Sequence, residues 1–374
     1  MKVILAQLKK PWNETRQKEK IGHALEESGL THLYYFGKAH ASETQKPGEE
    51  VFQIHDNQVL ILSLWQFFRY CQKIKPEAII VANPALLLPA ALYKCTAATR
   101  LIFDCQENFE WNFVFQRGYP TWKSLIFPAL SRFFLRNLFG FADRIWLAEE
   151  IYSRQIPYLP QGKWQIFENK VPEAWTEHRF PSENKTGICR IAMTGYLSDE
   201  AGTGKALAFM EAFRRQFPDV KFSLAGQIPD AGLRNQYMRQ HPEADFSLTK
   251  TWTDSQTIHR VLAGADAVLI PYRISKANEG KFPTKMFEAV YEGKPMLCQQ
   301  NSPFMELACR EGRGIAVDFD HPEQNDFNRI LEEIRKAGKG QQGNPKWVFE
   351  GERLRKDFFG LFPQKKLPEQ ATDE

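Results

Sequence analysis

Short apolar runs alternate with helical patterns from one end to the other of this chain of 374 residues. Strands of a parallel sheet that is covered by helices on both faces have this form, because nearly all of their side chains are buried. The alternation therefore predicts βαβ units and an α/β fold with parallel sheets. A chain of this length accommodates two hydrophobic cores, so we expect two doubly wound domains.

The predicted elements form two halves of one architecture. The strands of the first half are expected at residues 2–7, 32–37, 78–82, 100–105 and 144–149. The helical patterns between them lie near residues 15–28, 59–74, 85–95 and 121–140. The strands of the second half are expected at residues 190–195, 221–226, 245–250, 267–272, 295–299 and 314–317, with helices in the gaps.

A polar, proline-containing segment without apolar periodicity, residues 172–187, separates the halves, and we interpret it as an interdomain linker. The predicted domains are an N-terminal Rossmann-like domain, 1–175, and a C-terminal Rossmann-like domain, 176–345. Residues 346–362 have the apolar spacing of an amphipathic helix that packs on a domain surface. Residues 363–374 are expected to form a disordered tail.

Composition excludes several classes of protein. Hydrophobic residues make up 43% and charged residues 25%, as in globular proteins, which excludes a disordered, collagen-like or disulfide-rich chain. The net charge of +4 predicts no nucleic-acid partner, and the six scattered cysteines have no metal-binding spacing. The longest apolar stretch, 78–93, is interrupted by prolines and is too short to span a membrane. The first residues lack the pattern of a secretion signal, so we expect a cytoplasmic protein.

The segment EGKFPTKMFEAVYEGKPML, residues 279–297, is the most informative stretch. A helix is predicted to begin at Thr284, and the free N–H groups of a helix start favour an anion, which Lys281 and Lys285 reinforce. Glu288, one turn further, suits hydrogen bonds from sugar or ribose hydroxyls. These residues predict a phosphate site, and the alternative is an ordinary surface helix with solvated lysines.

Two other patterns resemble ligand motifs only in part, and a third ligand motif is missing. The stretch AGTGKA, 201–206, lacks the spacing of a phosphate-binding loop. The run Asp318-Phe319-Asp320 follows a strand and is interpreted as a turn and helix cap, not as a metal-binding pair. No G-x-G-x-x-G follows a predicted strand, which argues against a nicotinamide dehydrogenase. We therefore predict neither a metal nor a cofactor.

The stretch PTKMFEAVYEGKPM resembles the donor-binding signature of the family 4 (group 1) glycosyltransferases, which have the GT-B fold. Further stretches are similar to that family in the same order along the chain: FDCQENFEWN, ADRIWLAEE, FENKV, MTGYLSDEAG, FSLAG and GADAVLIPYR. The resemblance implies two Rossmann-like domains that face each other across a cleft, with the acceptor in the N-terminal domain. It also implies metal-independent transfer of a hexosyl group from a nucleotide diphosphate sugar, with retention, to a glycan or lipid-linked acceptor. Cell-surface polysaccharide or glycoconjugate synthesis is the corresponding process.

Particular residues receive roles from this resemblance. The donor-binding candidates are Gly195, Lys205, Arg273, Glu279, Lys281, Thr284, Lys285 and Glu288. Lys285 also has a catalytic role as the partner of the leaving diphosphate. Glu107 and Asp104 are the acceptor-side catalytic candidates, because they follow a strand where open α/β sheets place ligands. The alternative for Asp104 is that it caps a loop.

The chain departs from the family pattern at three positions. Tyr196 follows Gly195 where many members have an arginine, Glu279 lies one place from the usual first acidic position, and Gln106 replaces a histidine. A catalytically degenerate GT-B scaffold that binds a nucleotide sugar or a protein partner is therefore an alternative. A two-lobed solute-binding protein is a further alternative, which the missing secretion signal disfavours.

Aromatic and basic residues are interleaved in residues 109–141. Rings and cations together suit the headgroup zone of a membrane. We predict that Trp111, Trp122 and Arg132 contact a membrane surface or a lipid-linked acceptor, which places the protein peripherally on the inner membrane face. The alternative is a helix that is buried in the core of the N-terminal domain.

Overall fold

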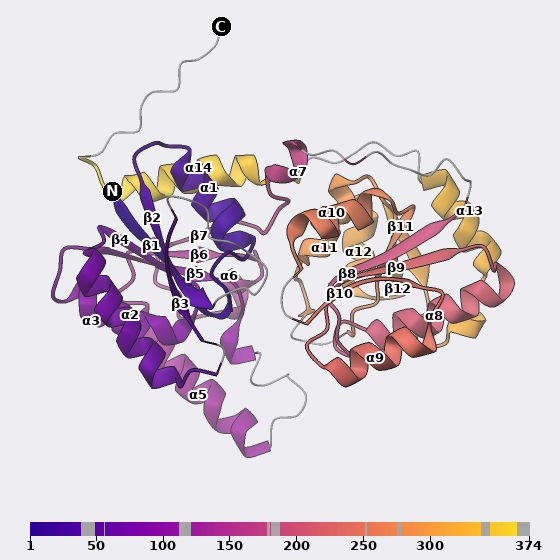
Figure 1. Cartoon of the computed structure of the whole chain (residues 1–374), viewed down its shortest axis with the longest axis horizontal. Helices are drawn as coiled ribbons and strands as arrows, with labels where there is room; N and C mark the ends of the chain where they lie inside the picture. Colours follow the sequence, from indigo (N-terminus) through magenta and orange to yellow (C-terminus); the bar gives the residue numbers. More distant parts are fainter. Residues whose placement is uncertain are drawn as a thin grey trace, which may run out of the picture. The chain divides into compact units, whose positions relative to one another are not determined.

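The computed structural model of the chain consists of two compact units (Figure 1). The first unit is Met1–Asn169 with the C-terminal helix, and the second is Lys170–Lys346. The structure describes residues 1–38, 49–55, 57–111, 121–177, 180, 188–250, 253–274, 278–337 and 345–364, with side chains 121–127 left out. Residues 365–374, which include most of the predicted disordered tail, lie outside this description.

The first unit is built on a seven-stranded parallel sheet of order β3-β2-β1-β4-β5-β6-β7. Its strands are β1 (Lys2–Pro11), β2 (His32–Lys38), β3 (Glu50–Ile54), β4 (Ala78–Val81), β5 (Arg100–Cys105), β6 (Arg144–Leu147) and β7 (Trp164–Ile166). The central strands are mainly apolar and mostly buried, because helices cover both faces of the sheet.

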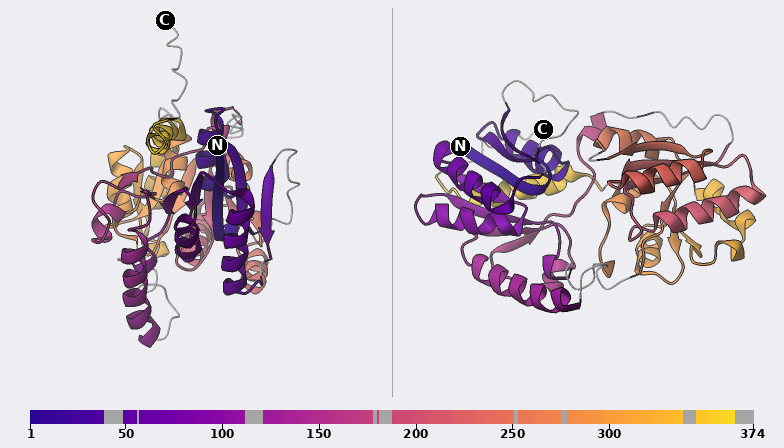
Figure 2. Two further views of the ribbon diagram at one scale, coloured as in Figure 1. Left: turned by 90° about the vertical axis from the view of Figure 1, so that its left-hand side faces the viewer. Right: turned by 60° about the horizontal axis from the view of Figure 1, so that its bottom comes forward.

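Each face of the first sheet has its own helices (Figures 1 and 2). One face carries α2 (Leu60–Ile74), α3 (Pro84–Lys94) and α5 (Thr121–Leu138), and the other carries the π-helix η1 (Arg16–Gly22), α1 (His23–Glu26) and α14 (Trp347–Gly360). The short helix α6 (Tyr152–Gln155) precedes β7. Asn83 accepts a hydrogen bond from the N–H of Ala85, and Pro84 occupies the first turn, so α3 begins where the sequence predicts.

The second unit is built on a six-stranded parallel sheet of order β10-β9-β8-β11-β12-β13. Its strands are β8 (Arg190–Tyr196), β9 (Lys221–Gln227), β10 (Asp245–Thr249), β11 (Ala267–Ile270), β12 (Met296–Gln299) and β13 (Gly314–Val317). Its helices are α7 (Ala174–Glu177), α8 (Thr203–Gln216), α9 (Ala231–Gln240), α10 (Ser255–Ala263), α11 (Thr284–Tyr291), α12 (Pro303–Arg310), the 3-10 turn η3 (Pro322–Gln324) and α13 (Phe327–Ala337). The prediction of two doubly wound, Rossmann-like domains is confirmed.

Both sheets reverse their strand order next to their first strand. The neighbours of β1 are β2 and β4, and the neighbours of β8 are β9 and β11. Loops that leave such a switch point in opposite directions open a crevice beyond the carboxyl ends of the strands. Each unit therefore has one edge at which ligand-binding residues are expected.

The structure differs from the sequence predictions at the sheet edges and at the linker. Strands β3 and β7 were not predicted, because edge strands are only half-buried and have a weak apolar pattern. The chain passes between the units at Asn169 and Lys170, before the predicted linker 172–187. Val171 and Trp175 are buried in the core of the second unit, so the start of that segment is not a linker.

The C-terminal helix α14 packs on the first unit. Trp347, Leu354 and Phe358 lie in the core cluster that also holds β1 and η1 side chains, while Phe349 is exposed. None of the described helices is long and apolar enough to cross a membrane.

Candidate functional site

Three glycines shape the carboxyl edge of the second sheet. Gly195 in β8 has a φ of +93° and pairs with Gly226 in β9, where an added Cβ would lie 1.9 Å from the Gly195 carbonyl oxygen. Gly202, which precedes α8, has a φ of +77°, and a Cβ there would lie 1.9 Å from the Pro271 carbonyl oxygen. Side chains are excluded at these positions, so the loops after β8, β9 and β11 approach each other closely.

Lys285 belongs to the first turn of α11, and its side chain extends over this edge of the sheet. A Cβ on Gly195 would be 2.6 Å from its Cε, and only 7% of the lysine is exposed. Its Nζ is 5.1 Å from the centroid of the Tyr272 ring, and it makes no hydrogen bond or ion pair with another described residue. A buried ammonium group that makes no hydrogen bond or ion pair suits an anionic ligand.

The start of α11 adds to this preference for an anion. Pro283 occupies the N-cap position, and no side chain caps the helix. The amide N–H groups of a first turn have no partners within the helix, and the helix dipole places partial positive charge there. The uncapped helix start and Lys285 therefore form one candidate phosphate site.

Burial lowers the pKa of Lys285 to about 8, although the nearby Glu288 carboxylate opposes this shift. Between about pH 8 and pH 10.5 the unfolded chain therefore binds more protons than the folded protein does. The free energy of unfolding of the unliganded protein should rise with pH over that interval. A bound diphosphate would favour the charged amine and raise its pKa again.

This linkage gives a pH dependence of ligand binding. We expect the Kd of a nucleoside diphosphate to rise about tenfold between pH 7 and pH 9, because the charged amine is depleted above its pKa. Calorimetric titration at several pH values measures the slope. The change of the Kd with pH should be much smaller in Lys285→Met than in wild type. An equal change in both proteins would assign the titration to another group.

The other donor-binding candidates have different environments. Arg273 lies in the loop after β11, and its Nη1 is 3.7 Å from the Asp199 carboxylate and has no hydrogen-bond partner among the described groups. Lys205, in contrast, is paired with Asp320. Thr284, Lys281 and Glu288 are half-buried along α11 and its preceding loop, and Glu279 is exposed.

Sequence reasoning missed some residues of this edge. Tyr272 provides the ring beneath the Lys285 ammonium, and Gly202 and Gly226 provide the close approach of the loops. The hydroxyls of Thr194 and Thr203 are buried there without a hydrogen-bond partner among the described groups. Gly202 and Gly226 lie in the stretches MTGYLSDEAG and FSLAG that resemble the family pattern. Only the pairing of β8 with β9 shows that Gly226 faces Gly195.

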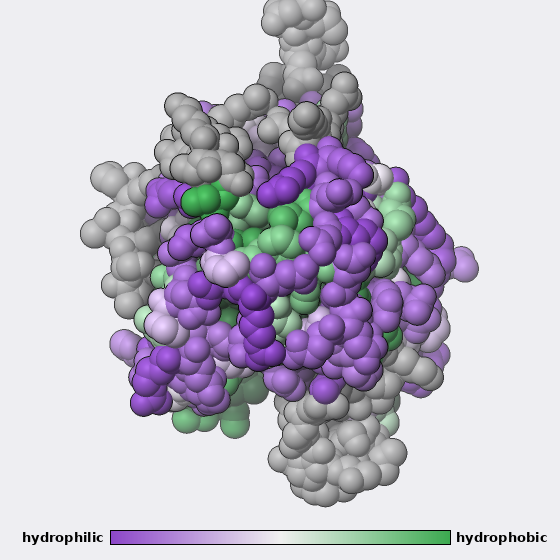
Figure 3. Space-filling model, turned by 90° about the vertical axis from the view of Figure 1, so that its right-hand side faces the viewer, coloured by the Kyte–Doolittle hydropathy of each residue, from purple (hydrophilic) through white to green (hydrophobic). Residues whose placement is uncertain are grey.

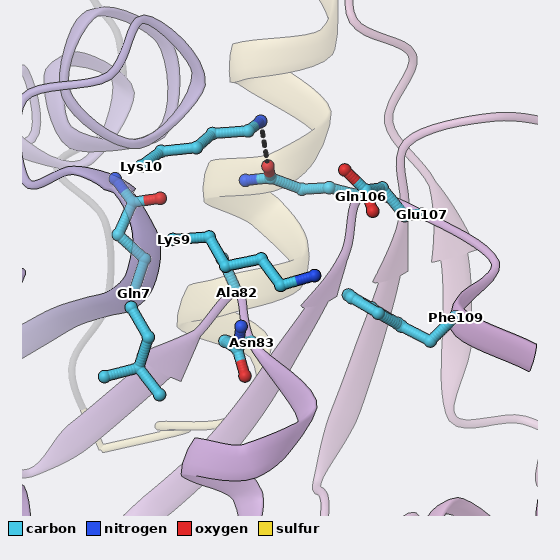
Figure 4. Close-up of a pocket in the computed structure, with 9 residues that line it drawn as sticks. Gln7, Lys9, Lys10, Ala82, Asn83, Gln106, Glu107 and Phe109 are labelled. Carbon is cyan, nitrogen blue, oxygen red and sulfur yellow. Dashed lines mark hydrogen bonds between the residues drawn. The ribbon is translucent and has the colours of Figure 1, made fainter. Parts of the chain in front are cut away.

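The first unit has a hollow at the carboxyl ends of β1, β4 and β5 (Figure 4). Its volume is about 290 Å3, including space open to solvent. Its polar lining is Gln7, Lys9, Lys10, Asn83, Gln106 and Glu107. The Lys9 side chain extends into the hollow and its Nζ is 5.9 Å from the Phe109 ring centroid, which leaves a charged group beside an aromatic surface.

The two acceptor-side candidates are placed differently. Glu107 lines the hollow, whereas the Asp104 carboxylate has no exposed surface. Asp104 accepts hydrogen bonds from Arg16, at 2.8–3.1 Å, and from Gln17 and Gln106. Gln106 in turn accepts a hydrogen bond of 2.7 Å from Lys10. This placement favours a positioning role for Asp104 and direct ligand contact for Glu107.

Of the three predicted membrane-contacting residues, the structure describes the side chains of two. Trp111 is half-buried, and Arg132 is exposed but paired with Glu110. Trp122 lies in the first turn of α5, among the side chains that the structure does not describe. Leu135 of α5 and the nearby Phe139 are buried in the core, whereas Phe133 and Phe134 are exposed.

The Asp318 carboxylate caps a turn. It accepts hydrogen bonds from the N–H groups of Asp320 and His321. Burial alone would raise the Asp318 pKa, but hydrogen bonds from Gln299, His321 and Asp320 outweigh it and lower the pKa below its ordinary value. The prediction of a turn at this position is confirmed.

No known family model matches the chain, and no curated protein sequence matches it. Solved structures do. Sucrose-phosphate synthase from Thermosynechococcus elongatus is 14% identical, with a TM-score of 0.66 and coverage of 98% of this chain and 100% of that chain. HepE from Anabaena, in complex with UDP, is 13% identical, with a TM-score of 0.65 and coverage of 96% and 100%. A UDP-N-acetylglucosamine 2-epimerase is 13% identical, with a TM-score of 0.60 and coverage of 98% and 97%. The chain thus has the GT-B fold, which these proteins share although their named activities differ.

Proposed function

We propose that the protein is a glycosyltransferase that moves a sugar from a nucleotide diphosphate sugar to a glycan or lipid-linked acceptor. The observation that carries this proposal is Lys285, which is buried against Gly195 at the uncapped start of α11. Transfer with retention, in the synthesis of cell-surface polysaccharide or glycoconjugate, is the finer form of the proposal. It rests on the resemblance of residues 283–296 to the family 4 signature.

The proposed donor site stabilises charge that develops on the leaving group. As the bond between the sugar and the diphosphate breaks, negative charge accumulates on the phosphate oxygens. The Lys285 ammonium and the amide N–H groups of α11 are fixed in place before the reaction, so they stabilise this charge without reorganisation. Glu288, one turn along α11, accepts hydrogen bonds from ribose or sugar hydroxyls.

The proposed acceptor site is the hollow of the first unit. Glu107 is placed to orient an incoming hydroxyl, while Asn83 and Lys9 offer hydrogen bonds to further hydroxyls of a glycan. The Phe109 ring supplies an apolar surface for the face of a sugar ring. A lipid-linked acceptor would bring the enzyme to the inner membrane face, which agrees with the proposed peripheral location.

The alternative function is a GT-B scaffold that binds a nucleotide sugar or a protein partner without catalysing transfer. The pairing of Lys205 with Asp320 favours it, because that lysine is then engaged before any phosphate arrives. Tyr196 in the place of an arginine and the exposed position of Glu279 favour it as well.

A ligand screen followed by a transfer assay separates these functions. UDP, GDP and ADP and their sugar conjugates are first compared by thermal shift. A ligand at 100 times its Kd should stabilise the fold by about 2.7 kcal/mol. The selected conjugate is then incubated with glycan and lipid-linked acceptors. Binding with transfer supports the transferase, and binding without turnover supports a scaffold for nucleotide sugars. No binding of any conjugate contradicts both of these and leaves only the scaffold that binds a protein partner.

We expect transfer to proceed without a divalent metal. The ammonium and amide groups of the proposed donor site supply the positive charge that a metal would otherwise provide at the diphosphate. Initial rates measured in excess chelator should therefore equal those measured with magnesium or manganese. A rate that disappears in chelator and returns with manganese would contradict this mechanism.

A further inference from the structure

The helices α2, α3 and α5 of the first unit expose apolar side chains on their outer surface. We call this surface the α2–α3–α5 outer face and define it by Ile61, Trp65, Leu88, Leu92, Phe133 and Phe134. Their exposed fractions range from 48% to 77%. Helix α2 packs beside α3, and α3 beside α5 (Figures 1 and 2), so the exposed side chains lie on neighbouring helices.

The inner sides of the same helices are also apolar. Phe67 of α2, Leu87 of α3 and Leu135 of α5 are buried in the core beneath the sheet. The helices are therefore apolar on two sides, whereas a helix at a water-facing surface usually has one apolar stripe. One face of the second unit, in contrast, is mainly hydrophilic (Figure 3). The large apolar residues that are exposed in that unit include Met238 and Ile274. Exposed apolar side chains that gather on neighbouring helices are typical of a binding surface.

All charged side chains of the three helices are positive. Their sequences, LILSLWQFFRYCQKI, PALLLPAALYK and TWKSLIFPALSRFFLRNL, contain lysine and arginine but no aspartate or glutamate. Arg69 lies 5.9 Å over the Trp65 ring, and Arg69, Lys73 and Arg136 are exposed and make no ion pair with a described residue. The outer face thus combines apolar rings with available cations.

Acidic groups from neighbouring segments neutralise only part of this charge. Glu110 pairs with Arg132, and Asp143 pairs with Lys94 at 2.5 Å and with Arg100. Arg69, Lys73 and Arg136 therefore retain their charge for an anionic partner.

We propose that the α2–α3–α5 outer face docks on an anionic lipid bilayer. Aromatic and aliphatic side chains enter the interfacial layer while arginine and lysine contact lipid headgroups, which is how amphipathic surfaces bind membranes without spanning them. This inference deepens the proposed peripheral location and replaces Trp111, Trp122 and Arg132 with a different set of residues. It does not depend on the donor site, so sugar transfer and membrane docking succeed or fail separately.

The test uses the full chain and vesicles of defined composition. Co-sedimentation is measured with phosphatidylcholine vesicles and with vesicles of equal parts phosphatidylcholine and phosphatidylglycerol, at low and high salt. One variant combines Ile61→Gln, Trp65→Gln and Phe133→Gln, and another combines Arg69→Gln, Lys73→Gln and Arg136→Gln. The matched control combines Met238→Gln, Ile274→Gln and Phe349→Gln, which removes exposed apolar side chains elsewhere. Circular dichroism confirms that each variant is folded.

Wild type and control should bind the anionic vesicles, and binding should weaken with salt and without phosphatidylglycerol. The partition coefficient onto anionic vesicles should fall at least tenfold in each variant of the outer face. In the variant without cations the reason is that each cation near an anionic surface contributes about fivefold, and in the apolar variant it is the loss of side chains that enter the interface. The proposal would be overturned if wild type does not bind anionic vesicles, or if the variants bind them as well as wild type does. If wild type instead forms a dimer that the apolar variant dissociates, and does not bind vesicles, the face is a protein interface and the proposal is wrong.

Discussion

Replacing Lys285 by methionine is expected to raise the Kd of the nucleoside diphosphate by roughly 10- to 150-fold. A charge-assisted hydrogen bond contributes about 1.5–3 kcal/mol, and methionine keeps most of the volume of the lysine stem while removing the ammonium. Isothermal titration calorimetry measures the change. The rate of sugar transfer should fall at saturating donor as well, because the same ammonium is proposed to stabilise the leaving diphosphate.

The variant should not lose stability. Burial of the Lys285 ammonium is unfavourable in the unliganded protein, as the lowered pKa indicates, so methionine should leave the free energy of unfolding unchanged or raise it. Lys221→Met is the control, since Lys221 is exposed at the start of β9, at the opposite edge of the same sheet. Unchanged affinity in Lys285→Met would remove this residue from the donor site. Equal losses in both variants would indicate a nonspecific effect of net charge.

Gly202→Ala is expected to lower the free energy of unfolding of the second unit by about 2–5 kcal/mol. A non-glycine residue with a left-handed backbone costs about 1–2 kcal/mol, and forcing an extra methyl group into a packed site costs about 1–3 kcal/mol more. The methyl group would lie 1.9 Å from the Pro271 carbonyl oxygen, so the loops after β8 and β11 must separate. Urea denaturation followed by circular dichroism measures the loss.

A control in the same unit separates the two contributions. Gly312 has a φ of +66° and nothing within 4 Å of an added Cβ, so Gly312→Ala should show the backbone cost alone. A loss in Gly202→Ala that is no larger than the loss in Gly312→Ala would mean that the close approach of the two loops is not rigid. The larger loss should be accompanied by weaker binding of nucleoside diphosphate, because the Pro271 loop leads into Tyr272 and Arg273.

Most of the strands could be predicted because they are buried on both faces. The strand segments VILA and AVLI are apolar throughout, and that pattern does not depend on which strand lies beside which. Strands β3 and β7 could not be predicted in this way, since they lie at the edges of the sheet, where a strand needs fewer apolar residues. The apolar spacing of α14 predicts a helix on a domain surface, but it does not specify the first unit as its partner.

The local part of the candidate site could be predicted from the sequence, but its contacts between distant segments could not. The stretch after residue 279 places a lysine in the first turn of a helix, and local geometry alone makes this turn attractive to an anion. The sequence pattern cannot show that Lys205 is paired with Asp320, that Asp104 is held by Arg16 from η1, or that Gly226 faces Gly195. Each of these contacts joins segments that are distant in the sequence.

The sequence by itself determined the class of fold, two parallel sheets with helices on both faces, and the location of a helix start that suits an anion. These features depend on periodicity and on local backbone geometry, which neighbouring residues specify. The tertiary structure alone decided which charged groups are neutralised and which remain available, as Arg132 and Arg69 illustrate. It also decided that α2, α3 and α5 bury one apolar side and expose another, because burial depends on how many neighbours a packed helix has and not on its own sequence.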